Sequence, residues 1–129
     1  MYAFGTMPLI AVVDDEEPVR RALKRLLRSA GLEAEDYASG QDFFAAERRA
    51  DCVVLGLHLP VTTGLQVLQR IRQMTKRMPV IVISAHDQLQ TREECMAAGA
   101  AAYLRKPLDE RLLLNAISAA LGAGTQVRR

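Results

Sequence analysis

The stretch Asp51-Cys52-Val53-Val54-Leu55-Gly56-Leu57-His58-Leu59-Pro60 decides how the rest of the chain is interpreted. Its apolar residues do not alternate with polar ones, and a Thr62-Thr63-Gly64 turn follows Pro60, which predicts a strand buried on both faces. Gly56 is an unusual residue at the end of such a strand, because glycine weakens a strand by roughly 0.5–1 kcal/mol relative to alanine and packs no side chain. The stretch therefore predicts a central strand that leads to a site with a side chain missing at its centre.

Composition indicates one soluble globular domain. The chain has 129 residues, of which half are hydrophobic and a quarter are charged; this length suits a single core. The net charge of +2 is too small to indicate nucleic-acid binding by the domain itself. No apolar run approaches the roughly 20 residues of a membrane helix, and Met1 to Pro8 lacks the pattern of a secretory signal.

The two cysteines predict a reducing environment. Cys52 falls in a predicted strand and Cys95 in a predicted helix, where both are expected to be buried free thiols. Thiols of this kind favour a cytoplasmic location. No group of Cys and His residues has the spacing of a zinc site.

Predicted strands and helices alternate along the chain. Apolar runs predict strands at Leu9–Val13, Leu32–Tyr37, the stretch quoted above, Pro79–Ala85 and Ala101–Arg105. Helical spacing predicts helices from Pro18 to Gly31, from Ser39 to about Arg49, and over Gly64–Met74, His86–Ala98 and Asp109–Leu121, with Gly122 ending the last one.

This alternation predicts an α/β fold. Strand–helix units require crossover connections, and these produce a parallel sheet with helices on both faces. Ligands of such sheets bind beyond the carboxyl ends of the strands. The residues expected at those ends are Asp14, Asp15, Gly56, His58, Ser84 and Lys106. Carboxylate oxygens suit Mg²⁺, whereas a hydroxyl and an ammonium suit the oxygens of a phosphoryl group.

Four motifs occur in order and at domain spacing over about Leu9 to Leu121, and with them the chain resembles the receiver domain of two-component response regulators. They are Val12-Val13-Asp14-Asp15-Glu16, Leu59-Pro60 with Gly64, Val82-Ile83-Ser84-Ala85, and Tyr103-Leu104-Arg105-Lys106-Pro107. The resemblance implies a doubly wound, flavodoxin-like (βα)5 fold with strand order 2-1-3-4-5, in a signalling module rather than an enzyme.

The resemblance also implies roles for the residues at the sheet edge. Asp15 would bind Mg²⁺ directly, Asp14 would act through water, and the backbone carbonyl of His58 would be a third ligand. Ser84 and Lys106 would contact phosphoryl oxygens. Tyr103 would be the aromatic switch paired with Ser84.

The departure from the family pattern is Gly56. Receivers carry the phosphoacceptor aspartate at this position, and glycine can neither attack phosphorus nor bind a metal. We therefore expect no phosphorylation at position 56 and only weak binding of Mg²⁺. Two explanations stay open: a variant of a phosphorylatable receiver, favoured by the retained Asp14, Asp15, Ser84 and Lys106, or a pseudo-receiver that works as an interaction module without phosphate. A small flavodoxin-like enzyme or flavin binder is a third.

Several of these residues also have ordinary structural interpretations. Asp14 and Asp15 could cap the first helix, Ser84 could cap the fourth, and Lys106 could be a surface charge. The basic face of the first helix is solvated or helps to dock a partner. Leu112-Leu113-Leu114 is too wide for one helical stripe, which leaves one exposed leucine or a contact between two copies.

The remaining expectations concern organisation and partners. Residues 1–8 form an N-terminal extension, residues 9–121 the receiver domain, and residues 122–129 a tail or the start of a linker. The expected partners are a histidine kinase or phosphotransfer protein, a C-terminal DNA-binding output domain, and a second copy of the chain bound through helices four and five.

Overall fold

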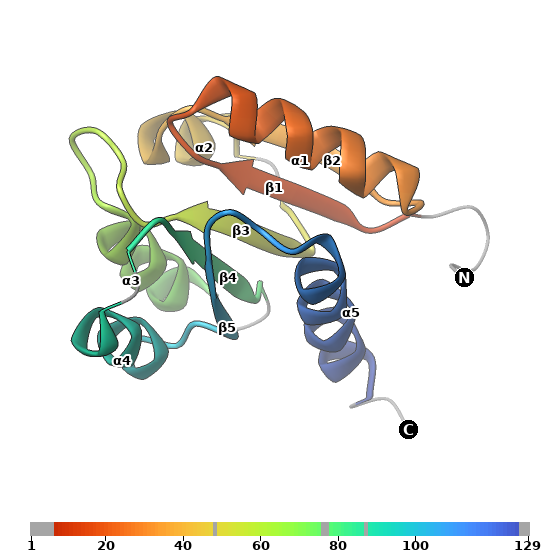
Figure 1. Ribbon diagram of the computed structural model, residues 1–129. Coiled ribbons are helices and arrows are strands. Elements are labelled where there is room, and N and C mark those ends of the chain that lie inside the picture. Colours follow the sequence, from red (N-terminus) through yellow and green to blue (C-terminus); the bar gives the residue numbers. More distant parts are fainter. Residues whose placement is uncertain (1–6, 48, 76–77, 87, 127–129) are drawn as a thin grey trace.

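The structure is a computed structural model that describes residues 7–47, 49–75, 78–86 and 88–126, so most of the predicted N-terminal extension and the last part of the tail lie outside the described residues. Strands and helices alternate over the described part of the chain (Figure 1). The strands are β1 (Leu9–Val13), β2 (Glu33–Tyr37), β3 (Cys52–Gly56), β4 (Val80–Ser84) and β5 (Ala102–Arg105). The helices are α1 (Glu17–Ser29), α2 (Gly40–Ala46), α3 (Gly64–Met74), α4 (Leu89–Ala97) and α5 (Glu110–Gln126).

The five strands form one parallel sheet in the order β2-β1-β3-β4-β5. This order confirms the predicted doubly wound fold. β3 lies at the centre, where Val54 is in register with Val12 of β1 and with Ile81 of β4. Every residue of β3 is buried, which explains why its sequence is apolar without alternation.

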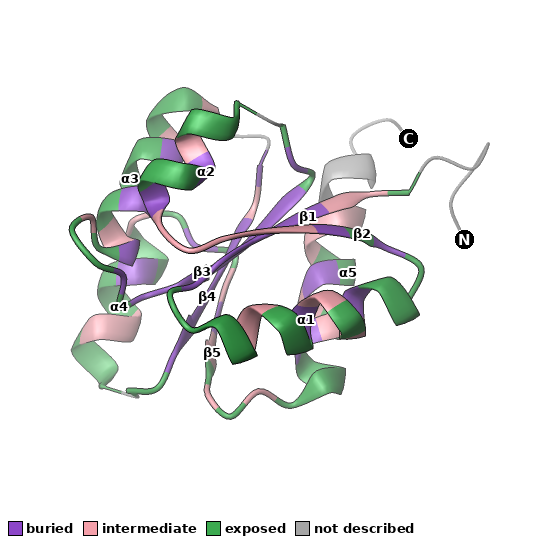
Figure 2. Ribbon diagram, turned by 90° about the horizontal axis from the view of Figure 1, so that it is seen from above, coloured by how far each residue is buried: buried purple, intermediate pink, exposed green. Residues whose placement is uncertain are grey.

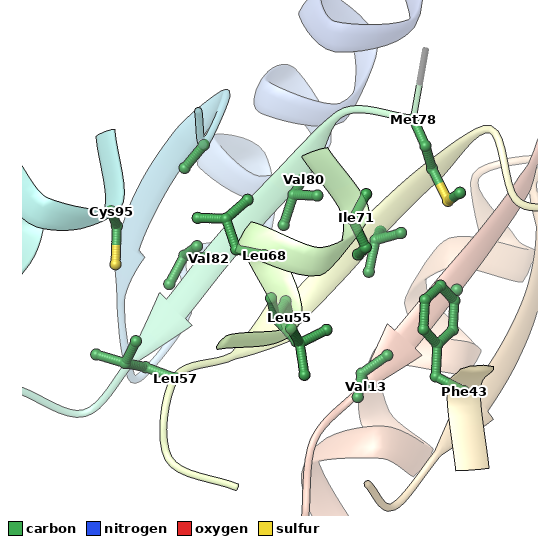
Figure 3. Packing of buried hydrophobic residues seen from close by; sticks show 14 of the residues in the cluster. Val13, Phe43, Leu55, Leu57, Leu68, Ile71, Met78, Val80, Val82 and Cys95 are labelled. Atoms are coloured by element: carbon green, nitrogen blue, oxygen red, sulfur yellow. The ribbon is translucent and has the colours of Figure 1, made fainter. Parts of the chain in front are cut away.

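Helices cover both faces of the sheet, with α1 and α5 on one side and α2, α3 and α4 on the other (Figure 2). Alternate strand residues point to opposite faces. Val13, Leu55 and Val82 therefore join Leu68 and Ile71 on the α2–α3–α4 side (Figure 3). The strand residues that point to the other face form a second core with residues of α1 and α5. Its strand members are Ile10, Val12, Val54, Ile81 and Ile83, and its helix members are Leu23, Leu27, Leu113 and Ile117.

Local sequence signals explain several helix ends. Pro18 lies in the first turn of α1, and Gly31 follows the helix with φ +85°, a backbone conformation that suits glycine. The Ser39 hydroxyl accepts a hydrogen bond from the backbone N–H of Asp42 and caps α2. Thr63 caps α3 in a capping box with Gln66.

Three predicted helix boundaries were wrong. Helix α2 ends at Ala46 and not near Arg49, because Glu47 adopts a left-handed backbone with φ 53°. Helix α4 begins at Leu89 and not at His86, because its N-cap residue Gln88 has an extended backbone, with φ −92° and ψ 131°. Helix α5 continues through Gly122 to Gln126, because glycine ends a helix only where it leaves the helical conformation.

The leucine triplet of α5 divides between core and surface. Leu113 is fully buried, Leu114 is half-buried, and Leu112 is 57% exposed. Within the part of the chain that the structure describes, no helix has the length and apolar character needed to span a membrane.

Candidate functional site

The residues predicted to meet at the carboxyl edge of the sheet do meet there. A hollow of about 260 Å³ at this edge is lined by Asp15, Glu16, Leu57, His58, Ile83, Ser84, Ala85, His86 and Lys106. These residues end or follow β1, β3, β4 and β5, whose parallel directions bring their ends together. Asp14 and Gly56 lie buried beside this hollow.

The acidic side chains after β1 form a compact cluster. Asp14, Asp15 and Glu16 each place a carboxylate oxygen within 4.8 Å of the others. Asp14 is only 1% exposed, whereas Asp15 and Glu16 are exposed. Oxygen donors of this kind fit a hard divalent cation such as Mg²⁺, which keeps several water ligands and needs few from the protein.

The Asp14 carboxylate is held by two hydrogen bonds. Its Oδ1 accepts from the backbone N–H of Glu16 at 2.9 Å, and its Oδ2 accepts from Lys106 Nζ at 3.0 Å. The first bond closes a turn of the Asx type just before α1, whose N-cap residue Glu16 makes no side-chain cap bond. The second joins the ends of β1 and β5 across the sheet edge.

Lys106 bridges two carboxylates. Its Nζ lies 3.0 Å from Asp14 Oδ2 and 2.9 Å from Glu16 Oε1, and the side chain is 19% exposed. Burial alone would lower the pKa of Lys106, but hydrogen bonds to Glu16 and Asp14 and the charges of both acids outweigh it, so the pKa lies above its ordinary value. The ammonium is therefore a fixed positive charge in the acidic cluster.

Gly56 lies directly against Asp14. A Cβ atom at position 56 would lie 2.5 Å from Asp14 Oδ2 and 3.1 Å from Asp14 Cγ. The sequence predicted a missing side chain at this point, and the structure places the Asp14 carboxylate in the space that such a side chain would enter. A larger residue at position 56 thus requires Asp14 to move.

Gly64 is required by a close approach of two backbones. Its N–H donates to the Leu57 carbonyl at 2.8 Å, and a Cβ on Gly64 would lie 2.6 Å from Leu57 Cα. The loop between β3 and α3 therefore returns against the end of β3. The sequence indicates Gly64 only as part of a motif, because a contact between residues separated by a whole loop cannot be read from the local pattern.

Ser84 and Tyr103 bind the same backbone residue. Ser84, which is 1% exposed, accepts a hydrogen bond from the N–H of His86 at 3.0 Å through its hydroxyl. Tyr103, also buried, donates its hydroxyl proton to the carbonyl of His86 at 2.8 Å. The Arg92 guanidinium lies 5.0 Å from the Tyr103 ring centroid. Ser84 and Tyr103 are thus linked through the β4–α4 loop.

Two residues of the rim had no role in the sequence analysis. His86 meets His58 edge to face, with ring centroids 4.8 Å apart and an interplanar angle of 83°. Glu16 is the second partner of Lys106. The adjacent acids of the Asp14–Glu16 motif were a signal for Glu16, but nothing in the local sequence pairs His86 with His58.

Comparisons with known proteins agree with this geometry. The profile of the response regulator receiver domain matches residues 10–118. Response regulator protein TodT of Pseudomonas putida is 34% identical over 122 residues, which cover 93% of this chain and 54% of TodT. Transcriptional regulatory protein FixJ of Azorhizobium caulinodans is 33% identical over 122 residues, covering 93% of this chain and 58% of FixJ.

A solved structure agrees as well. The response regulator receiver protein of Burkholderia phymatum is 44% identical and superposes with a TM-score of 0.79, covering 89% of this chain and 95% of that one. The chain spans little more than half the length of TodT and FixJ. From the matched profile over most of its length and the shared fold, the chain belongs to the response regulator receiver domain family.

Proposed function

We propose that this receiver domain of two-component signalling cannot accept a phosphoryl group, because Gly56 stands where the family carries its phosphoacceptor aspartate. The observation that supports this is the position of Gly56 at the end of β3, against Asp14 and beside the hollow lined by Ser84 and Lys106. Phosphorylation at this position needs a nucleophilic side-chain atom, such as a carboxylate oxygen, that attacks phosphorus while the bond to the leaving group breaks. Glycine supplies no such atom.

The other residues are proposed to have the roles that membership of the receiver family implies, and their places at the rim support these roles. Asp15 would contact Mg²⁺ directly, with Asp14 acting through water and the His58 carbonyl as a further ligand. The cation would neutralise charge on an incoming phosphoryl group. Ser84 and Lys106 would contact its oxygens, and Tyr103 would transmit the state of the site through the β4–α4 loop. Without a carboxylate at position 56, Mg²⁺ binding is expected in the millimolar range, roughly −4 kcal/mol.

Incubation with Mg²⁺ and acetyl phosphate, followed by intact-mass spectrometry, tests the proposal. The wild-type chain is expected to gain no mass. A stoichiometric gain of about 80 Da, the mass of one phosphoryl group, would contradict it, and peptide mapping would then identify the acceptor.

The matched variant is Gly56→Asp. In this protein Mg²⁺ is expected to draw the Asp14 carboxylate away from position 56, and the introduced carboxylate is expected to take up one phosphoryl group while acetate leaves. Beryllofluoride, a phosphate mimic, is expected to bind the same variant. A folded Gly56→Asp protein that binds Mg²⁺ and gains no mass would favour the phosphate-independent pseudo-receiver instead. Membership of the receiver family favours both the variant of a phosphorylatable receiver and the pseudo-receiver over a flavin binder.

A kinase or phosphotransfer partner is proposed for the face formed by α1 and the β5–α5 loop. An apolar groove of about 330 Å³ there is lined by Pro18, Val19, Ala22, Leu23, Leu26, Lys106, Pro107, Leu108 and Glu110. Basic side chains of the same helix, Arg21, Lys24, Arg25 and Arg28, line a second hollow together with Glu17 and Asp36, which pair with Arg21 and Lys24. An apolar groove and an excess of basic side chains on one helix suit a helical partner with acidic flanks.

The rest of the proposed organisation follows from the relatives and from the exposed apolar side chains. FixJ is named a transcriptional regulatory protein, and a DNA-binding output domain after the receiver would agree with that name, with residues 1–8 as an extension and a linker that starts near the end of α5, which reaches Gln126. The exposed Leu89, Met96 and Leu112 of α4 and α5 are the proposed dimer contacts.

The proposed location is the cytoplasm, because Cys52 and Cys95 are buried free thiols, which persist in a reducing environment.

A further inference from the structure

We propose that Lys106 is a built-in cation of the acidic cluster and that it lowers the affinity of the cluster for Mg²⁺. The proposal rests on the acidic Mg²⁺ site proposed above and assigns Lys106 a role that restricts the metal. Lys106 Nζ contacts Asp14 Oδ2 at 3.0 Å and Glu16 Oε1 at 2.9 Å. It thus occupies oxygens of two of the three clustered acids.

A backbone hydrogen bond fixes the position of Lys106 directly after β5. The backbone N–H of Lys106 donates to the Ser84 carbonyl at 2.7 Å, so β4 fixes where the side chain begins. The side chain then crosses the sheet edge from β5 to the β1 loop and is only 19% exposed. Because the backbone hydrogen bond and the partly buried position already restrict the side chain, Lys106 loses little conformational entropy when it pairs with Asp14 and Glu16.

Gly56 permits this arrangement. Asp14 Oδ2, the atom that Lys106 contacts, is also the atom that lies 2.5 Å from a Cβ at position 56. Any side chain at position 56 would push that oxygen away from its present place. Gly56 and the Asp14–Lys106 pair are therefore coupled, and the missing side chain and the built-in cation belong to one arrangement.

Mg²⁺ and Lys106 compete for the negative charge of the same acidic cluster. A metal ion held directly by Asp15 and through water by Asp14 would either displace the ammonium from Asp14 or lie close to it, and two like charges at short distance repel each other. Removing the lysine charge should therefore strengthen Mg²⁺ binding. Without the competition of Lys106, the three acids would depend on the metal for neutralisation.

The test compares Lys106→Met with Lys24→Met by calorimetric titration with MgCl₂ at low ionic strength. Both substitutions remove one positive charge, but Lys24 pairs with Asp36 on the flank of α1. Lys106→Met is expected to bind Mg²⁺ about tenfold more tightly than wild type, and Lys24→Met within about twofold. Lys106→Arg retains the charge and is expected to bind as wild type does.

The outcomes separate the two proposals. A folded Lys106→Met protein that binds Mg²⁺ no more tightly than wild type would overturn the role of Lys106 while leaving the metal site in place. Absence of Mg²⁺ binding in every variant would overturn the metal site and the built-in cation together, without affecting the predicted lack of phosphorylation. Lys106→Gln serves the same comparison if the methionine variant does not fold.

Discussion

Two ion-pair clusters of this domain have opposite balances of charge. At the sheet edge, Lys106 pairs with both Asp14 and Glu16, and Asp15 adds a third carboxylate. On the flank of the molecule, Arg20 and Lys24 of α1 both pair with Asp36 of β2, at 2.8 and 3.0 Å. The first cluster has more acids than bases, and the second has more bases than acids.

The difference separates a site from a structural contact. On the flank, Arg20 and Lys24 share the Asp36 carboxylate, and these bonds hold α1 against β2. At the edge, one ammonium is shared among acids that repel one another, and an added cation would relieve the repulsion. An excess of acids at the carboxyl edge of the sheet, where ligands of parallel sheets bind, therefore indicates where a cation is expected.

The largest expected effect is that of Gly56→Asp in buffer with EDTA. The new carboxylate would enter the edge cluster beside Asp14, and two unit charges about 4–5 Å apart at an effective dielectric constant near 20 repel by roughly 4 kcal/mol. Attraction to Lys106 offsets part of this. Urea denaturation should give a free energy of unfolding lower than wild type by about 3 kcal/mol.

Gly56→Ala is the control, since it adds the Cβ without the charge. It should cost less than Gly56→Asp in EDTA, and only Gly56→Asp should regain stability when Mg²⁺ is added. A Gly56→Asp protein that is more stable than wild type in EDTA would show that Lys106 already balances a further acid at this edge.

The next largest effect is that of Lys106→Met in EDTA. This change removes the ammonium that Asp14 and Glu16 share, and a partly buried pair that loses one member costs more than an exposed one. We expect the free energy of unfolding to fall by about 2 kcal/mol. If thermal and urea unfolding both give Lys106→Met the free energy of unfolding of wild type, the ammonium does not stabilise the edge cluster.

The smallest effect is that of Asp36→Asn on the flank. Burial alone would raise the pKa of Asp36. Hydrogen bonds from Lys24 and Arg20 and the charges of both residues outweigh this effect, so the pKa lies below its ordinary value of 3.8. The stabilisation is therefore complete above that value and is lost as pH falls through the lower folded pKa. At pH 7 the substitution should cost about 1 kcal/mol.

The pH dependence supplies the check. Urea denaturation of wild type and Asp36→Asn at several pH values from about 7 down to about 2.5 should give a difference that is constant above about pH 5 and shrinks below about pH 3.8. A difference that grows on acidification would contradict the assigned direction of the pKa shift.

Most of the fold could be predicted because it depends on patterns within single elements. The uninterrupted apolar runs of β3 and β4 indicated buried parallel strands, and Pro18, Gly31 and Ser39 marked helix ends. The errors at Glu47 and Gly122 have a common cause. Whether a residue adopts a left-handed or a helical backbone at a helix end depends on contacts that its neighbours in sequence do not reveal.

The site was predictable as a set of residues but not as a set of contacts. Asp14, Asp15, Ser84 and Lys106 follow strands, so a parallel sheet brings them to one edge whatever their rotamers. The partners of Lys106 were not predictable, because the ammonium could reach any of several acids. The edge-to-face contact of His86 with His58 joins two loops and leaves no periodic signal.

The sequence by itself determined that five strands lie parallel, that acids and a lysine gather at their carboxyl ends, and that position 56 has no side chain. Hydrophobic periodicity and chain connectivity are sufficient for these conclusions. Only the tertiary structure decided what occupies the space beside Gly56. The Asp14 carboxylate lies there, held by Lys106 from the far end of the chain, because side-chain positions in a buried cluster are set by packing and charge among residues distant in sequence.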